Sequence, residues 1–102
     1  MWLCLNDAFL SIVHKDCKDD ELLVRARRPG DIEKVFGNRV KATKTTNADY
    51  RYRLVVKRAD VERKLASQIN SISYKNFKDS VKDKKLHDAY LRVWGVMMGL
   101  QE

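Results

Sequence analysis

The first half of the chain alternates between short apolar runs and polar breaks, a pattern that predicts β-strands. Apolar, β-prone residues fill 2–5 and 8–13 on either side of Asn6-Asp7, which predicts a hairpin with a two-residue turn. A single long strand with a bulge is the alternative interpretation. After a polar loop, the sequence of residues 22–27 predicts a further strand.

A short helix is predicted next, over Ile32–Phe36, because its apolar residues recur at helical spacing. Asp31 is placed to cap this helix, and Gly37 is placed to end it. Two strands follow. The one over 40–43 contains a lysine, which is typical of a sheet edge, and the one over 50–56 has the clearest alternation.

The C-terminal half of the chain has helical periodicity. An amphipathic helix is predicted over 59–71, and a connection or a single turn over 73–78. A last helix follows, beginning at Asp79 or at Lys84, and Ser80 or Asp79 is its expected N-cap.

The last helix is predicted to end at Met98 and to bury one apolar stripe. Tyr90 and Trp94 are its expected core anchors, because large aromatic side chains dominate core packing. The stripe follows spacings of three and four residues: Leu86, Tyr90, Val93, Trp94 and Met97.

The predicted order of elements is ββ-β-α-β-β-α-α, in a single α+β domain over residues 1–102. Its middle is the ferredoxin-like pattern without the last strand. The N-terminal hairpin can supply that strand by pairing antiparallel to residues 22–27. We therefore expect an antiparallel sheet with helices on one face, in a permuted ferredoxin-like arrangement.

Composition indicates a globular protein, with 44% hydrophobic and 34% charged residues among 102. No apolar run approaches the roughly 18 residues that span a bilayer, and the apolar start lacks the features of a signal peptide. We therefore expect a cytoplasmic protein. In that reducing compartment Cys4 and Cys17 are expected to be free thiols, although a disulfide is the alternative. Neither has neighbours at zinc-ligand spacing, so no metal or cofactor is expected.

The net charge of +7 is unevenly distributed. Residues 1–50 hold 9 Lys and Arg against 8 Asp and Glu, whereas residues 51–102 hold 12 against 6. A local surplus of this kind favours polyanionic partners, either nucleic acid or an acidic protein surface.

Four arginines form the first candidate site: Arg25, Arg27, Arg51 and Arg53. The alternation of strand side chains puts each pair on one face, while the apolar residues and Tyr50 and Tyr52 lie on the opposite face, toward the helices. The arginines would then cluster on the open side of the sheet. Open sheets of this kind bind RNA, but they usually stack the bases on aromatic residues. A solvated charged face is the alternative.

Five lysines form the second candidate site, just before and at the start of the last helix: Lys75, Lys78, Lys82, Lys84 and Lys85. Lysines at a helix N-terminus oppose its dipole, so a bound phosphate would be favourable there. Asp79 and Asp83 partly offset these charges, and an ordinary solvated surface is the alternative.

A contact with another chain is the third candidate. Leu91 and Met98 lie on a flank of the last helix away from its stripe, which predicts an oligomer or partner contact. The alternative is a sheet broad enough to cover the whole helix.

Catalysis is the weakest candidate, because no enzyme motif is present. His87 and Asp88 are neighbours on a helix and do not face each other, and His14 follows a strand. A small nuclease that uses His14 or His87 is therefore only an alternative function.

Several segments resemble a family of short bacterial proteins of unknown function: Asn76–Val81, His87–Trp94, Met1-Trp2, Phe9–Val13 and Ala48–Arg51. The resemblance covers most of the chain and implies no residue roles. Small basic proteins of this type also occur among phage and mobile-element products, including inhibitors of CRISPR systems, which is an analogy at the level of the class.

The leading hypothesis is a small basic, non-enzymatic protein that binds nucleic acid or a nucleoprotein partner. Its main expected contacts come from the basic half: Arg51, Arg53, Lys82, Lys84 and Lys85. The first alternative is an anti-CRISPR-like inhibitor from a phage or mobile element, which would act on a nucleoprotein defence complex through protein contact. The second is the nuclease.

Overall fold

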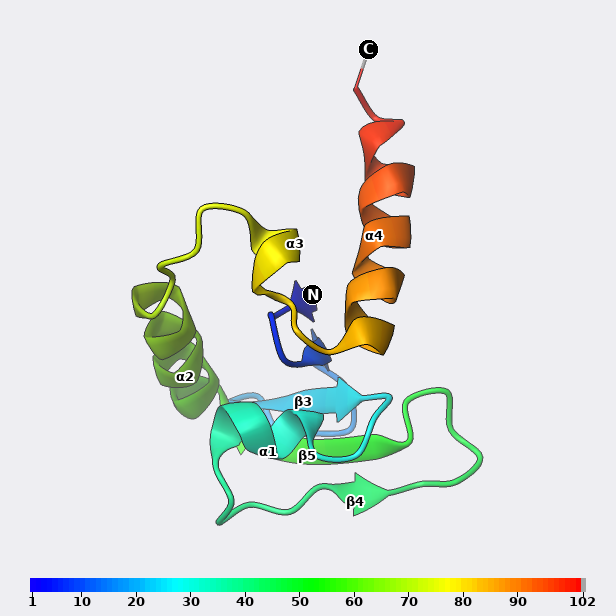
Figure 1. Ribbon diagram of the computed structural model, residues 1–102. Helices are drawn as coiled ribbons and strands as arrows, with labels where there is room; N and C mark the ends of the chain where they lie inside the picture. Colours follow the sequence, from blue (N-terminus) through cyan, green and yellow to red (C-terminus); the bar gives the residue numbers. More distant parts are fainter. Residues whose placement is uncertain (102) are drawn as a thin grey trace.

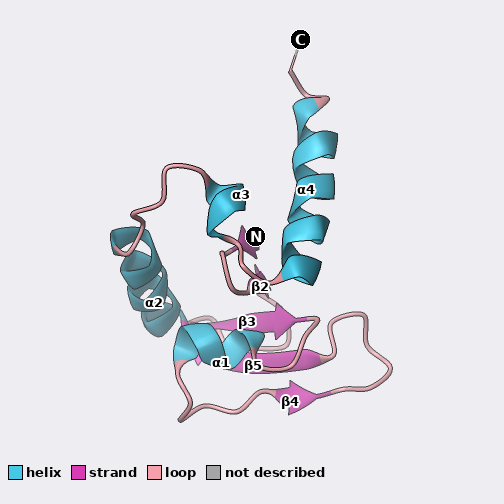
Figure 2. Ribbon diagram, viewed as in Figure 1, coloured by secondary structure: helices cyan, strands magenta, loops and turns pink. Residues whose placement is uncertain are grey.

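The computed structural model describes residues 1–101 and confirms the α+β class (Figure 2). Five strands and four helices follow one another along the chain: β1 (Trp2–Cys4), β2 (Phe9–Val13), β3 (Glu21–Ala26), α1 (Asp31–Phe36), β4 (Thr43–Lys44), β5 (Tyr52–Lys57), α2 (Arg58–Asn70), α3 (Phe77–Ser80) and α4 (Lys84–Met98).

The strands form one antiparallel sheet with the order β1-β2-β3-β5-β4. The predicted hairpin is confirmed, since Leu3 pairs with Leu10 and the Leu5 amide donates to the Ala8 carbonyl oxygen at 2.9 Å. Its second strand pairs antiparallel with β3, as expected. Along the chain, α1 connects β3 to β4. In the sheet, β5 lies between these two strands. The permuted ferredoxin-like assignment stays a prediction.

Two strands are shorter than predicted because local side chains satisfy their backbone groups. β4 starts at Thr43 and not at 40, since the Ala42 amide donates to Glu33 Oε2 on α1 at 3.3 Å. It lies at the sheet edge, as predicted. β5 starts two residues late, and there the Tyr50 amide donates to the Asp49 carboxylate at 2.8 Å.

The main core lies between one face of the sheet and helices α1 and α2 (Figure 1). Its buried members alternate along the strands and recur at helical spacing in α1: Ala8, Leu10, Ile12, Val24, Ala26, Ile32, Val35, Phe36 and Val61. Burial of each large aliphatic or aromatic side chain contributes about 1.5–3 kcal/mol. This core holds the sheet and its two helices together.

Asp31 is not the N-cap of α1, which corrects the prediction. Gly30 holds that position with φ 87°, in the left-handed region that glycine adopts readily, and no side chain caps the helix. Asp31 is the first helical residue and is 2% exposed. Its carboxylate instead accepts a hydrogen bond from the Phe9 amide at 3.2 Å. The predicted end at Gly37 is confirmed.

α4 begins at Lys84, the second of the two predicted starts. Its N-cap is Asp83, whose carboxylate accepts from the Leu86 amide at 3.1 Å. The prediction of Ser80 or Asp79 was wrong because both belong to the separate short helix α3. Val81 has an extended backbone and is buried, so it ends α3 and separates the two helices.

A second, smaller core joins α3 and α4 to the N-terminal hairpin. Val81, Leu86 and Tyr90 are its buried residues, and Phe9 and Phe77 pack against them. Phe9 neighbours Leu10 in β2, so its side chain lies on the sheet face opposite the main core. The hairpin therefore takes part in both cores. The expectation of helices on one face of the sheet was wrong, because α1 and α2 pack on one face and α3 and α4 pack against Phe9 on the other.

Only the lower half of the predicted α4 stripe is buried. Leu86 and Tyr90 are buried, whereas Val93, Trp94 and Met97 are half-exposed, so the assignment of Trp94 as a core anchor was wrong. The reason is visible in Figure 1, where the upper half of α4 extends away from the rest of the molecule. No helix within residues 1–101 combines the length and the apolar composition that crossing a bilayer requires.

Candidate functional site

Three of the four predicted arginines come together on the sheet face opposite α1 and α2. Arg25 and Arg53 are direct partners across β3 and β5. The guanidinium carbons of Arg25 and Arg27 lie 4.5 and 4.2 Å from the ring centroid of Tyr50. We call Arg25, Arg27 and Arg53 the arginine cluster. Arg51, the fourth, lies just before β5 and outside these contacts.

Tyr50 was predicted to point toward the helices, and this was wrong. Its ring contacts Arg25 and Arg27 instead, and the residue is 4% exposed. Because β5 begins only at Tyr52, the strand alternation does not extend to Tyr50. An aromatic ring therefore packs within the arginine cluster, but its burial leaves no free face for stacking.

One carboxylate opposes the arginine cluster. Asp49 Oδ1 lies 3.7 Å from Arg53 Nη2, and the Asp49 carbonyl oxygen accepts from Arg27 at 3.0 Å. The hydrogen bond from the Tyr50 amide, together with the charges of Arg25, Arg27 and Arg53, lowers the pKa of Asp49. A single anion among three cations leaves this surface positive.

Arg25 also contacts β2, the strand on the other side of β3 from β5. Its Nη2 donates to the buried Ser11 Oγ at 2.8 Å, while its buried Nε has no hydrogen-bond partner in the described chain. The hydrogen bond to Ser11 and the contact with the Tyr50 ring hold Arg25 on the sheet face, so Arg25 has a structural role whatever else it binds. The buried Nε without a partner is a cost to stability.

The five predicted lysines do not form one cluster. Lys84 pairs with Asp88 at 3.0 Å, and Lys82 donates to the Asp79 carbonyl oxygen at 2.9 Å. Lys78 Nζ lies 4.5 Å from the ring centroid of Trp94. Lys75 and Lys85 have no ion-pair partner among residues 1–101.

Two adjoining cavities run between the N-terminal hairpin and α4, and we call them together the α4 groove. The first, of about 470 Å³, is bordered by Trp2, Phe9, Arg27 and Lys85. The second, of about 490 Å³, is bordered by cations and apolar side chains: Lys75, Phe77, Lys78, Trp94 and Met97. Both are lined by Cys4, Tyr90 and Val93. The groove thus gathers four of the predicted cations.

Two tryptophans border this groove with much of their surface free. Trp2 is 71% exposed and meets Phe9 edge-on, with 6.1 Å between ring centroids. Trp94 is 50% exposed. Sequence reasoning missed both as site residues, because it assigned Trp2 to a strand and Trp94 to the core. The sequence feature that could have indicated a site was Trp2, a large aromatic residue in β1 at the edge of the sheet.

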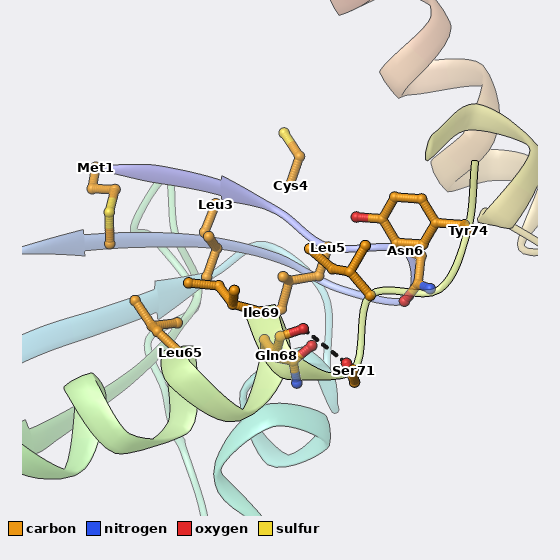
Figure 3. Close-up of a pocket in the computed structure, with 11 residues that line it drawn as sticks. Met1, Leu3, Cys4, Leu5, Asn6, Leu65, Gln68, Ile69, Ser71 and Tyr74 are labelled. Carbon is orange, nitrogen blue, oxygen red and sulfur yellow. Dashed lines mark hydrogen bonds between the residues drawn. The ribbon is translucent and has the colours of Figure 1, made fainter. Parts of the chain in front are cut away.

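A third cavity, of about 350 Å³, lies on the other side of β1, against the end of α2 (Figure 3). Leu3 and Leu5 from the hairpin face Leu65 and Ile69 from α2 across it. No lysine or arginine lines it. This cavity lacks the charge that distinguishes the α4 groove.

The histidines and cysteines do not assemble a reactive centre in the described chain. His14 Nε2 lies 3.1 Å from the Lys18 carbonyl oxygen, and His87 Nδ1 lies 3.7 Å from Asp88 Oδ1. Cys4 and Cys17 are free thiols, and burial raises the pKa of Cys4. Residues 1–101 contain no group of three His, Cys, Asp or Glu side chains that could hold a metal ion.

Comparison with protein-family models, with curated proteins and with solved structures gives no match for this chain. The residues and their geometry therefore carry the functional argument.

Proposed function

We propose that this protein binds single-stranded nucleic acid in the α4 groove. The observation that carries the proposal is the pairing of two exposed tryptophans with cations along one groove. Trp2 borders the part that holds Arg27 and Lys85, and Trp94 borders the part that holds Lys75 and Lys78.

The chemistry of the groove suits an unpaired strand better than a duplex. Single strands are bound by aromatic side chains on which bases stack, at about 1–3 kcal/mol per base, and by cations that follow the backbone. Trp2 offers free ring surface, and Trp94 stays half-exposed although Lys78 lies over one face of its ring. Tyr50 in the arginine cluster is buried and offers none. In a duplex, the bases are already stacked on one another and cannot reach these rings.

Arg27 joins the two positive surfaces of the molecule. It borders the groove and also stacks on Tyr50 within the arginine cluster. A strand in the groove could therefore continue toward Arg25 and Arg53. Lys82 and Lys84, which were expected as main contacts, have local partners instead and stand outside the two groove linings.

The geometry favours binding over cleavage. Neither His14 nor His87 lines the groove, and no metal-binding cluster is found in residues 1–101 to replace them. The one carboxylate in the groove lining is that of Asp31, which is 2% exposed and paired with Arg28, so it is poorly placed to act as a general base for the nuclease alternative.

Fluorescence anisotropy with labelled single strands and duplexes of about 20 nucleotides, over a salt series, tests the proposal. We expect tighter binding to single strands and a log–log salt slope near −3, because each phosphate contact contributes about −0.7. Four cations border the groove besides Arg28, which is already paired with Asp31 and Asp83. Lys75→Gln/Lys85→Gln should weaken binding about tenfold.

The matched control is Lys15→Gln/Lys41→Gln, which removes the same charge from exposed loop positions. We expect it to change affinity by less than about twofold at moderate salt. Equal losses from the two double variants would mean that net charge, and not the groove, governs binding. No binding at low salt would overturn the proposal.

A protein partner is the second candidate, favoured by the apolar side chains that share the groove with its cations. Val93 and Met97 are half-exposed there, which a nucleoprotein surface could cover as well as a nucleotide base. The inhibitor of a nucleoprotein defence complex belongs to this class. A protein retained stoichiometrically in a pull-down from nuclease-treated lysate would favour it over direct nucleic-acid binding.

A further inference from the structure

The upper half of α4 is apolar on every side. Residues 93–100 contain no charged side chain, and Val96 and Leu100 are about three-quarters exposed, at 75% and 74%. A helix with apolar residues around its whole circumference is normally buried. The α4 groove lies on only one side of this segment.

Leu91, Gly95 and Met98 lie on a different side. Their spacings of four and three residues put them on one helical face, away from the face of Tyr90 and Met97. Leu91 is 42% exposed and Met98 is 52% exposed. These are the two residues that the sequence indicated as a contact with another chain.

The exposed area of the whole chain also points to a missing partner surface. The chain exposes 7455 Å², whereas a compact monomer of 11.9 kDa exposes about 5,900 Å². Its radius of gyration is 14.4 Å, against about 13 Å for a compact domain of this length. The excess of about 1,500 Å² is what one subunit of an obligate homodimer buries.

We propose that a second copy of this chain covers that face, with the two α4 helices packed antiparallel about a two-fold axis near Gly95. A two-fold interface must be complementary to itself. The face provides this, because a hollow at Gly95 lies between the bulky Leu91 and Met98. An axis at Gly95 places Leu91 of one copy against Gly99 of the other.

No contact within residues 1–101 explains a glycine at position 95. A Cβ atom added there would meet nothing within 4 Å, and glycine inside a helix is less stable than alanine. Close approach of a second helix supplies a reason for glycine at this position. Residues 93–100 carry no charge, so two chains of charge +7 can meet there. The axis at Gly95 places Arg92, at the border of this segment, against Met98 of the other copy and not against its own equivalent.

The proposal is independent of nucleic-acid binding and is tested by the mass of the intact protein in nucleic-acid-free buffer. Sedimentation velocity between about 1 and 100 µM should give about twice 11.9 kDa at the upper concentrations. Leu91→Glu/Met98→Glu should shift the protein to monomer. A wild-type protein that stays at the mass of one chain throughout would overturn the proposal.

Two single variants locate the interface and exclude unfolding as the cause. Gly95→Leu raises helix propensity and fills the hollow, so it should give a monomer with unchanged or higher helix content by circular dichroism. Val96→Glu, on the opposite side of the same helix, should stay dimeric. A dimer that survives Gly95→Leu and Leu91→Glu/Met98→Glu, or that is lost in Val96→Glu, would show that this face is not the interface.

Discussion

The hydroxyl group of Tyr90 lies 2.9 Å from the carbonyl oxygens of both Leu5 and Ala8, so one donor on α4 links to both ends of the hairpin turn. Burial raises the pKa of Tyr90, and the hydroxyl therefore keeps its proton and donates. This contact fixes α4 against the hairpin and so sets the distance between the two walls of the α4 groove.

Tyr90→Phe should destabilise the protein by about 1–2 kcal/mol, because the part-buried Leu5 carbonyl oxygen and the buried Ala8 carbonyl oxygen both lose this donor. The free energy of unfolding from urea titration measures the effect. Tyr74→Phe is the control, since Tyr74 lies at the surface and donates no hydrogen bond within the described residues. Equal stability of the two variants would show that the Tyr90 hydroxyl does not hold α4 in place.

Asp31 makes a second connection between separate elements. Its buried carboxylate accepts from the Phe9 amide at 3.2 Å and from Arg28 Nε at 3.4 Å, and Arg28 also pairs with Asp83 at 2.9 Å. Asp31 thereby links α1, the hairpin and the start of α4.

Asp31→Asn should cost about 1.5–3 kcal/mol, because it removes the charge that accepts hydrogen bonds from the Phe9 amide and from Arg28, while Arg28 keeps Asp83 as a partner. Urea unfolding again gives the free energy. Glu62→Gln, an exposed position on α2, should change stability by less than about 0.5 kcal/mol. A comparably small effect at Asp31 would mean that the hydrogen bonds alone, without the charge, stabilise this junction.

The strands and main helices could be predicted because their apolar spacing is local in the sequence. The hairpin around Asn6-Asp7 and the end of α1 at Gly37 follow from residue type and position alone. The errors occur where a side chain bonds to a distant backbone group. Asp31 resembles a cap, but it is buried because the Phe9 amide needs an acceptor.

The candidate site could be predicted only in part, for the same reason. Its cations were visible in the sequence, but Arg27 and Lys85 were assigned to separate surfaces because nothing local indicates that α4 meets the hairpin. Trp94 was assigned to the core because its helical spacing matches that of Tyr90. The short helix α3 leaves that upper part of the stripe uncovered, which depends on the whole fold.

Acid should loosen the start of α4. The hydrogen bond from the Leu86 amide, and then the one from Arg28, lowers the pKa of Asp83 below the ordinary value of 3.8. A carboxylate with a lowered folded-state pKa stabilises the fold fully above its unfolded-state pKa. That stabilisation is lost as the pH falls through the folded-state value.

Asp83→Asn tests this directly, because asparagine still caps the helix but carries no charge. The variant should have a lower midpoint of thermal unfolding than wild type at pH 7, and the difference should shrink as the pH falls toward about 2. Glu62→Gln is the control, because its unfolding midpoint shows how acid affects the protein when an exposed carboxylate elsewhere is removed. A difference that stays constant with pH would exclude the Asp83 charge as its source.

Arg27 and Arg51 carry the same charge but differ in position, which makes them a test of the groove. Arg27 borders it and stacks on Tyr50, whereas Arg51 is exposed just before β5. Arg27→Gln should weaken binding to single strands about tenfold and make the salt slope shallower by about 0.7. Arg51→Gln should change affinity by less than about twofold.

The affinity of Arg27→Lys should fall between those of wild type and Arg27→Gln, because lysine keeps the charge but loses the planar stacking on Tyr50. If Arg51→Gln costs as much as Arg27→Gln in the same anisotropy titrations, the strand follows the open surface beside β5 and not the α4 groove.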